Sequence, residues 1–169
     1  MSIPPIPEEE ATTQAQILFH EEDISFTLPN ELTFIHWIRS VIESQSCHLK
    51  QLNYIFCSDA ALLKVNLEYL DHDSYTDIIT FPYSSTPDIE GDIFISIDRI
   101  RENAAKFEQP FERELKRVMI HGVLHLCGYG DKSDEEQRIM RAKEDEAISL
   151  FPISWFFPIL LNNPVLLVL

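Results

Sequence analysis

The sequence has few cysteines and few positive charges. Its 169 residues include three cysteines, Cys47, Cys57 and Cys127, without a CxxC pair. Scattered thiols in an odd number exclude a disulfide-rich secreted scaffold and indicate a reduced, cytoplasmic setting. Lysine and arginine number 13 against 28 acidic residues, so the formal net charge is -15. This charge argues against broad nonspecific adhesion to nucleic acid or to an anionic membrane, because attraction to phosphate needs local positive potential.

The two ends of the chain lack the patterns of targeting and membrane segments. The start carries acids and prolines where a signal peptide would have a basic start and an apolar run, so we expect residues 1–15 to form a disordered leader. Residues 151–169 are strongly apolar, but Pro152, Pro158 and Pro164 interrupt any helix. We expect this tail to pack on the domain or to remain an apolar, partly disordered end that is prone to association, rather than to enter a membrane.

Residues 16–150 are predicted to form one α+β domain, since the chain is long enough for one core and too short for two. Strand-like runs come first and helical spacing dominates later, which is typical of an α+β layer. The predicted strands are a hairpin at 16–28 around an acidic turn, and runs at 48–58, 76–84 and 91–97. The predicted helices span about 30–45, 59–69, 97–107, 110–127 and 133–150.

Two of these helices have recognisable starts. Asn30 can cap the first helix, whose core-facing stripe is predicted from its apolar residues at helical spacing, Leu32, Ile35, Ile38, Val41 and Ile42. Ser133 and Glu136 stand at capping-box positions before the last helix.

The stretch HGVLHLCGYGD carries the candidate metal ligands. Residues four apart on a helix lie on the same face, so the imidazoles of His121 and His125 can bind one ion. Gly128 and Gly130 allow the chain to turn back after the helix, which can bring Asp131 to the same ion. Two histidines and one carboxylate make an acceptable zinc shell, with a fourth position left for water. An open position favours catalysis, because bound zinc lowers the pKa of its water toward about 7.

The sequence leaves the role of these residues open. Both histidines could be satisfied by neighbouring helices, with Asp131 only a turn residue. Gly122 stands where the metalloprotease pattern HExxH has the glutamate that acts as general base. A metal site here would therefore suit a substrate that needs only metal-bound hydroxide, or one whose own phosphate assists. Cys127 faces another side of the helix and is interpreted as a buried structural thiol.

Three segments, in order, resemble the signatures of one family. HGVLHLCGYGD resembles the HGxLHLxGYDH signature of the YbeY family, the bacterial metal-dependent endoribonucleases of ribosomal RNA maturation. YTDIITFPY, at 75–83, resembles that family's TDVLSFP segment, and GDIFIS, at 91–96, resembles its GDI strand. The resemblance covers roughly residues 16–150. It implies a metzincin-like α+β domain with a small mixed sheet, a metal-binding helix across the sheet, and one zinc ion held by three side chains.

The resemblance also implies which residues hold the ion. The family's first two histidine ligands fall on His121 and His125, and its third falls on Asp131, a ligand that zinc also accepts. The family's N-x-x-Y-R segment reads NLEYL here, so Leu70 stands at the position of an arginine that could stabilise charge on a transferring phosphate.

Four further residues are candidates for supporting roles. Arg101, Lys116 and Arg117 could supply the missing positive charge, because the stretch 97–126 is the least acidic part of the chain and its best surface for RNA. Asp77 could orient a ligand histidine as a hydrogen-bond acceptor, and a turn or cap role is the alternative.

The resemblance implies a zinc-dependent endoribonuclease that cuts single-stranded RNA at the 3′ end of the small-subunit ribosomal RNA, with a zinc-bound water as nucleophile. Ribosomal RNA and ribosome-associated proteins are the expected partners, and DNA is not an expected partner. A protein partner or the ribosomal surface would guide so acidic a chain to RNA better than bulk electrostatics. Two alternatives remain, a metal-dependent peptidase of metzincin-like ancestry and a non-catalytic, metal-stabilised adaptor on the ribosome.

Overall fold

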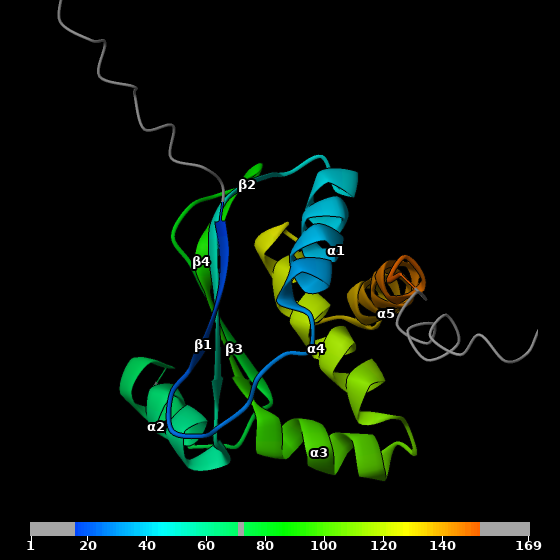
Figure 1. The fold of residues 1–169 in the computed structure, drawn as a ribbon. Helices are drawn as coiled ribbons and strands as arrows, with labels where there is room; N and C mark the ends of the chain where they lie inside the picture. The colour runs from blue at the N-terminus through cyan, green and yellow to red at the C-terminus, as the bar shows by residue number, and fades with distance from the viewer. Residues whose placement is uncertain (1–15, 71–72, 153–169) are drawn as a thin grey trace, which may run out of the picture.

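The structure is a computed structural model that describes residues 16–70 and 73–152 (Figure 1). The leader 1–15 and nearly all of the apolar tail therefore lie outside the described residues. Within the described ranges no helix is long and apolar enough to cross a membrane. The strands are β1 (Gln16–Glu21), β2 (His48–Cys57), β3 (Ile78–Pro82) and β4 (Asp88–Ser96). The helices are α1 (Glu31–Ser44), α2 (Asp59–Leu70), α3 (Ile97–Lys106), α4 (Phe111–Leu126) and α5 (Asp134–Ser149).

The four strands form one mixed sheet in the order β1-β2-β4-β3. β1 and β4 both pair in parallel with β2, and β3 pairs antiparallel with β4. The hairpin predicted at 16–28 is therefore wrong, because β1 pairs with β2 after α1 and residues 22–28 form no strand. Tertiary contacts draw this segment away from the sheet: Asp23 binds Ser58 at the start of α2, and Phe26 packs edge-to-face on Phe56 and Phe111.

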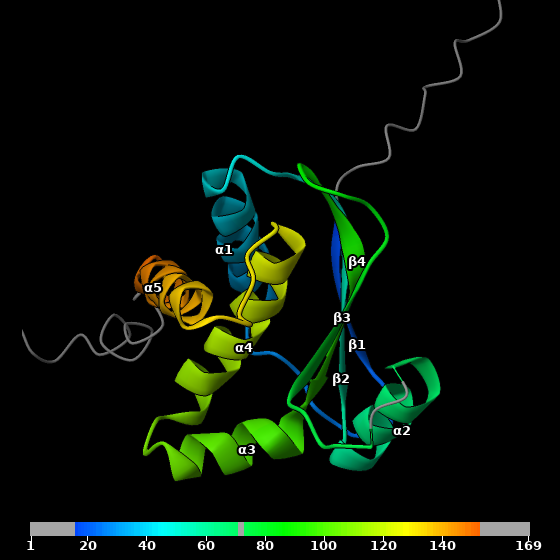
Figure 2. The ribbon, with the colours of Figure 1, turned by 180° about the vertical axis from the view of Figure 1, so that it is seen from behind.

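Helices cover the two faces of the sheet unequally. Figures 1 and 2 show α1, α4 and α5 on one side and α2 on the other. Side chains of β2 and β4 alternate between the faces, and the larger core lies under α1 and α4, with Leu52, Tyr54 and Ile93 among its members. A smaller cluster under α2 contains Cys57, Leu62 and Ile79. This layering confirms the predicted α+β class.

Helix α1 begins after Asn30 as predicted, but its buried face is rotated from the expected one. Leu32 is 66% exposed, so its predicted core position is wrong, whereas Phe34 and Trp37 are buried. The reason lies in α5, because the Trp37 indole donates a hydrogen bond to the Ala147 carbonyl at 2.7 Å. The side chain of Asn30 makes no capping hydrogen bond.

Helix α4 packs directly on β3 and β4 at Gly122. A Cβ atom at Gly122 would lie 2.9 Å from the Cδ1 atom of Ile78 and 3.0 Å from that of Ile93. The glycine thus permits a close approach of helix and sheet, which places the C-terminal turn of α4 beside the β3 edge.

Candidate metal centre

Helix α4 ends in a turn that reverses the chain beside its own histidines. Gly128 has a φ of +96°, in the left-handed region that favours glycine. Its N–H donates to the His125 carbonyl at 2.9 Å, and the N–H of Tyr129 donates to the Leu124 carbonyl at 3.0 Å. These two bonds form a Schellman motif. The chain therefore turns back, and Asp131 follows three residues after the glycine.

Hydrogen bonds hold both imidazoles in one tautomer. The Nδ1 atom of His121 lies 2.7 Å from the Glu144 carboxylate, and that of His125 lies 2.9 Å from the Tyr129 carbonyl. Because the carbonyl and the carboxylate accept, each Nδ1 carries the proton and donates it. With its proton on Nδ1, a neutral imidazole carries the unshared electron pair on Nε2, which is the form of histidine that binds a metal.

The two Nε2 atoms converge with the carboxylate of Asp131. They lie 2.9 Å from each other, and Asp131 Oδ2 lies 3.6 Å from that of His121 and 3.4 Å from that of His125. Two electron pairs and a carboxylate at this separation repel one another, so the cluster fits a bound cation, and its N and O donors suit zinc. Burial and the neighbouring Cys47 raise the pKa of the Cys127 thiol to about 12, which agrees with a structural rather than a ligating thiol.

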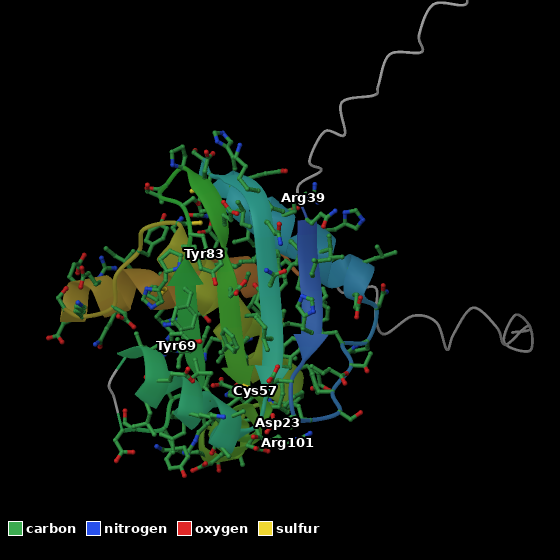
Figure 3. The ribbon with its side chains drawn as sticks, turned by 90° about the vertical axis from the view of Figure 1, so that its left-hand side faces the viewer. Asp23, Arg39, Cys57, Tyr69, Tyr83 and Arg101 are labelled. Carbon is green, nitrogen blue, oxygen red and sulfur yellow. The ribbon has the colours of Figure 1, made fainter. Side chains whose placement is uncertain are left out.

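A cavity of about 720 Å³ opens beside these ligands. Strand β3, the end of α2 and the end of α4 form its walls, which include Leu70, Thr76, Asp77, Thr80, Ser84 and Asp131. Asn66 supports the wall, since its buried side chain donates to the Ser74 carbonyl at 2.7 Å. Tyr69, next to Leu70, packs edge-to-face on Phe81 at the β3 edge of the sheet (Figure 3). The arrangement leaves one side of the ligand cluster open to a substrate.

The three cations proposed from the sequence lie outside the described lining of this cavity. Arg101 is exposed on α3 and lies 3.7 Å from Asp98. The ammonium of Lys116 lies 3.8 Å from the centroid of the Phe151 ring, in a separate apolar groove of about 570 Å³. Arg117 is held in a buried cluster of carboxylates. Among the residues that the structure describes, the cavity wall contains no lysine or arginine.

The carboxylate that supports a ligand histidine is Glu144 of α5. The sequence predicts Asp77 for this role, but Asp77 accepts a hydrogen bond from Asn103 at 3.3 Å and lies 3.7 Å from Arg117. Asp77 still lines the cavity. The one sequence signal for Glu144 is its place on the apolar face of α5, whose buried residues are Met140, Glu144 and Ala147. A glutamate in such a stripe indicates a paired, buried carboxylate.

The geometry also explains the missing glutamate of the HExxH pattern. Gly122 is buried between α4 and the sheet, where even a Cβ atom would lie 2.9 Å from Ile78 and 3.0 Å from Ile93, closer than van der Waals contact allows. A glutamate at this position would point into the core rather than into the cavity. The close packing of helix on sheet therefore excludes the general base of that pattern.

The fold and the cluster define a class, an α+β protein whose candidate metal site lies on a helix across a mixed sheet. The family model described as Endoribonuclease YbeY matches residues 16–151. Endoribonuclease YbeY of Flavobacterium psychrophilum is 54% identical over 131 residues, which cover 78% of this chain and 94% of the relative. Its counterpart in Flavobacterium johnsoniae is 50% identical over 131 residues, with the same shares of each chain.

A solved structure agrees with these relatives. The solution structure of a Thermotoga maritima protein is similar at a TM-score of 0.58 and 25% identity, and the match covers 79% of this chain and 87% of that chain. The chain therefore belongs to the YbeY family.

Proposed function

We propose that this protein is a zinc-dependent endoribonuclease that hydrolyses phosphodiester bonds in single-stranded RNA. The observation that carries the proposal is the convergence of two Nε2 atoms and one carboxylate at the wall of an open cavity. The relatives that match most of the chain are named endoribonucleases, which supports an RNA substrate. An N and O donor set supports zinc.

The chain's own residues orient the metal ligands and offer hydrogen bonds to the substrate, but the described cavity wall supplies no lysine or arginine. A zinc ion held by the three ligands would activate a water molecule as nucleophile and polarise the scissile phosphate. Glu144 and the Tyr129 carbonyl hold the two imidazoles so that both Nε2 atoms face the cavity. The hydroxyls of Thr76 and Ser84, on the cavity wall, donate to the Ile78 and Asp88 carbonyls, so their oxygens are left to accept a hydrogen bond from a ribose hydroxyl.

We place this activity at the 3′ end of the small-subunit ribosomal RNA, in the cytoplasm. The acidic chain supports a role for a ribosomal or ribosome-associated partner in delivering the RNA, because a net charge of -15 opposes long-range attraction to phosphate. The resemblance of its three sequence segments to the YbeY signatures supports the ribosomal substrate.

The test compares the wild type with Asp131→Ala and with the double variant His121→Ala, His125→Ala. We expect one zinc per chain in the wild type by elemental analysis, less in Asp131→Ala and none in the double variant. Cleavage of a single-stranded RNA that carries the 3′ end of the small-subunit RNA should fall in the same order. A wild type without stoichiometric metal, together with unchanged cleavage in Asp131→Ala, would contradict the proposal.

A peptidase is the second candidate because β3 is the edge strand of the sheet and lines the cavity, where an extended peptide could pair with it. The position of Gly122 weighs against it, since no acid stands where HExxH has its base. Turnover of a peptide library without RNA cleavage would reverse this ranking. Normal ribosomal RNA maturation in cells that carry only the double histidine variant would instead favour the non-catalytic adaptor.

A further inference from the structure

Glu144 is a buried carboxylate in direct contact with a candidate metal ligand. The residue is 2% exposed, and its Oε1 atom accepts the Nδ1 proton of His121 at 2.7 Å. Its Oε2 atom is buried and has no hydrogen-bond partner among the described residues. A buried carboxylate is unfavourable unless other groups compensate its charge. The partners around Glu144 therefore decide what it does.

The nearest buried cation is committed to another carboxylate. Arg117 donates two hydrogen bonds to Glu114, from Nε at 3.0 Å and from Nη2 at 2.7 Å. Its Nη1 atom lies 3.7 Å from Glu144 Oε2, and Asp77 is also 3.7 Å from its Nη2 atom. Burial alone would lower the pKa of Arg117, but the hydrogen bonds and charge of Glu114, followed by Glu144 and Asp77, raise it. Three carboxylates thus share one guanidinium.

The other cation near Glu144 offsets the negative charge of its carboxylate only weakly. Arg141 Nη1 lies 3.4 Å from Glu144 Oε2, but the arginine side chain is 65% exposed and screened by water. Negative charge is therefore left facing His121. A cation bound at Nε2 of His121 would compensate this negative charge, because a carboxylate that accepts from Nδ1 makes Nε2 a stronger metal ligand.

Helix α5 holds Glu144 in place. The Ala147 carbonyl, almost one turn further along the helix, accepts the Trp37 indole hydrogen bond. At the start of α5, Ser133 and Glu136 form the predicted capping box, in which each side chain binds the other's backbone N–H. Glu144 therefore presents its carboxylate to His121 from a fixed position.

We propose that Glu144 is a positioning residue that fixes the tautomer and orientation of His121 and sets the metal affinity of the site. The Glu114–Arg117 pair holds Glu144 without neutralising it. This role goes beyond the proposed function, because it concerns metal binding and holds whatever reaction the metal serves.

The experiment measures zinc affinity by competition with a chromophoric chelator in three full-length proteins, the wild type, Glu144→Gln and Glu114→Gln. Glutamine has nearly the shape of glutamate but carries no charge. We expect Glu144→Gln to bind zinc about 10–100-fold more weakly, the usual effect of losing a partner of a ligand histidine. Glu114→Gln is the matched control, since Glu114 is equally buried in the same cluster and contacts Arg117 instead of His121.

The control should lose thermal stability yet keep its zinc affinity within about threefold of the wild type. Unchanged affinity in Glu144→Gln would overturn the proposal, and so would equal weakening in the two variants, which would assign the effect to the cluster as a whole. A measurement on the wild type covers the case of a variant that does not fold. Nitrogen-15 NMR of the His121 imidazole should show a proton on Nδ1 and none on Nε2. The opposite tautomer would also overturn the proposal. Neither readout depends on RNA cleavage.

Discussion

Leu70 places an apolar side chain on the wall of the candidate catalytic cavity, at the position where the YbeY signature has an arginine. It is 43% exposed, so a longer side chain there has room to extend into the solvent-filled cavity. The described wall has no lysine or arginine that could take over. Under the proposed function, charge on the phosphate would then be stabilised by the metal and by neutral hydrogen-bonding groups.

An arginine at this position should increase RNA cleavage. We expect Leu70→Arg to raise kcat/KM about tenfold, because a charged hydrogen bond to phosphate contributes about 1.5 kcal/mol, which is close to a factor of ten in rate. The measurement is single-turnover cleavage of a short RNA at fixed zinc.

Leu67→Arg is the matched control for Leu70→Arg, since Leu67 is 45% exposed on the same helix and lies outside the described cavity lining. It adds the same charge at a distance from the ligands. If both variants accelerate cleavage equally, the gain comes from net charge, and the assignment of Leu70 to the cavity chemistry is wrong.

Asp23 predicts a pH dependence of stability. The N–H of Ser58 donates to its carboxylate at 2.8 Å, and the Ser58 hydroxyl donates to its other oxygen. These bonds lower the pKa of Asp23 below its ordinary value of 3.8. Because the folded-state pKa is the lower one, the stabilisation is present above about 3.8 and is lost as the pH falls through the folded-state value. Figure 3 shows Asp23 at the end of the sheet near Cys57.

Asp23→Asn should therefore lower the melting temperature at pH 7 and have a smaller effect near pH 3. Thermal unfolding of both proteins across this range checks the expectation. A difference between them that stays constant with pH would show that the carboxylate charge of Asp23 does not stabilise the start of α2.

At the scale of secondary-structure elements, glycines set how closely the strands and α4 approach. A Cβ atom at Gly91 would lie 2.4 Å from the backbone oxygen of Phe81 on the neighbouring strand β3. At Gly122 the nearest atoms are side-chain methyl groups of Ile78 and Ile93, at 2.9 and 3.0 Å. A backbone oxygen cannot move without disturbing the β3–β4 pairing, whereas methyl groups can rotate away.

Gly91→Ala should accordingly destabilise the protein more than Gly122→Ala. We expect a loss of about 1–3 kcal/mol for Gly91→Ala, the usual range for overpacking. Alanine at Gly122 also gains helix propensity of up to about 1 kcal/mol, which offsets part of its clash. Denaturant unfolding of the two variants measures the difference, and an equal or reversed order would contradict this account of β3.

At the scale of the whole molecule, charge distribution governs how the protein meets RNA. The net charge is -15, and the candidate cations are held by acidic partners or an aromatic ring outside the cavity. Few phosphates can then be neutralised on binding. Affinity for RNA should come from the metal site and from neutral contacts, with a ribosomal partner supplying the rest.

Salt dependence tests this expectation. Binding of single-stranded RNA to the isolated protein should weaken with salt at a logarithmic slope of magnitude about 1, equivalent to one or two neutralised phosphates. Fluorescence anisotropy between low and moderate salt gives the slope. A magnitude of about 3 or more would reveal a basic surface at odds with this charge distribution.

Local pattern was sufficient for the helices and for the centre of the site. Helical spacing predicted all five helices within a few residues of their observed bounds, and the capping box at Ser133 is confirmed. The four-residue spacing of His121 and His125 and the turn at Gly128 brought Asp131 to the cluster as expected. These features depend on contacts between residues close in the chain, which the sequence displays directly.

Long-range contacts escaped prediction. The part of 16–28 that follows the acidic turn is predicted as a second strand, yet Asp23 in the turn and Phe26 after it bind partners distant in sequence, and this segment does not join the sheet. Leu32 has the right spacing for the core, but α5 pairs with Trp37 and sets a different rotation of α1.

The sequence by itself determined the helix that carries two histidines, the glycine turn after it and the acid that returns to them, because each depends on local geometry. Only the tertiary structure decided that Glu144 supports His121, that Arg117 lies beside Glu144 of α5 and Asp77, and that Gly122 lets α4 pack closely on the sheet. These roles arise where separate elements pack together. Burial then decides whether a charged residue faces a substrate or another side chain, and no periodicity in the chain encodes that choice.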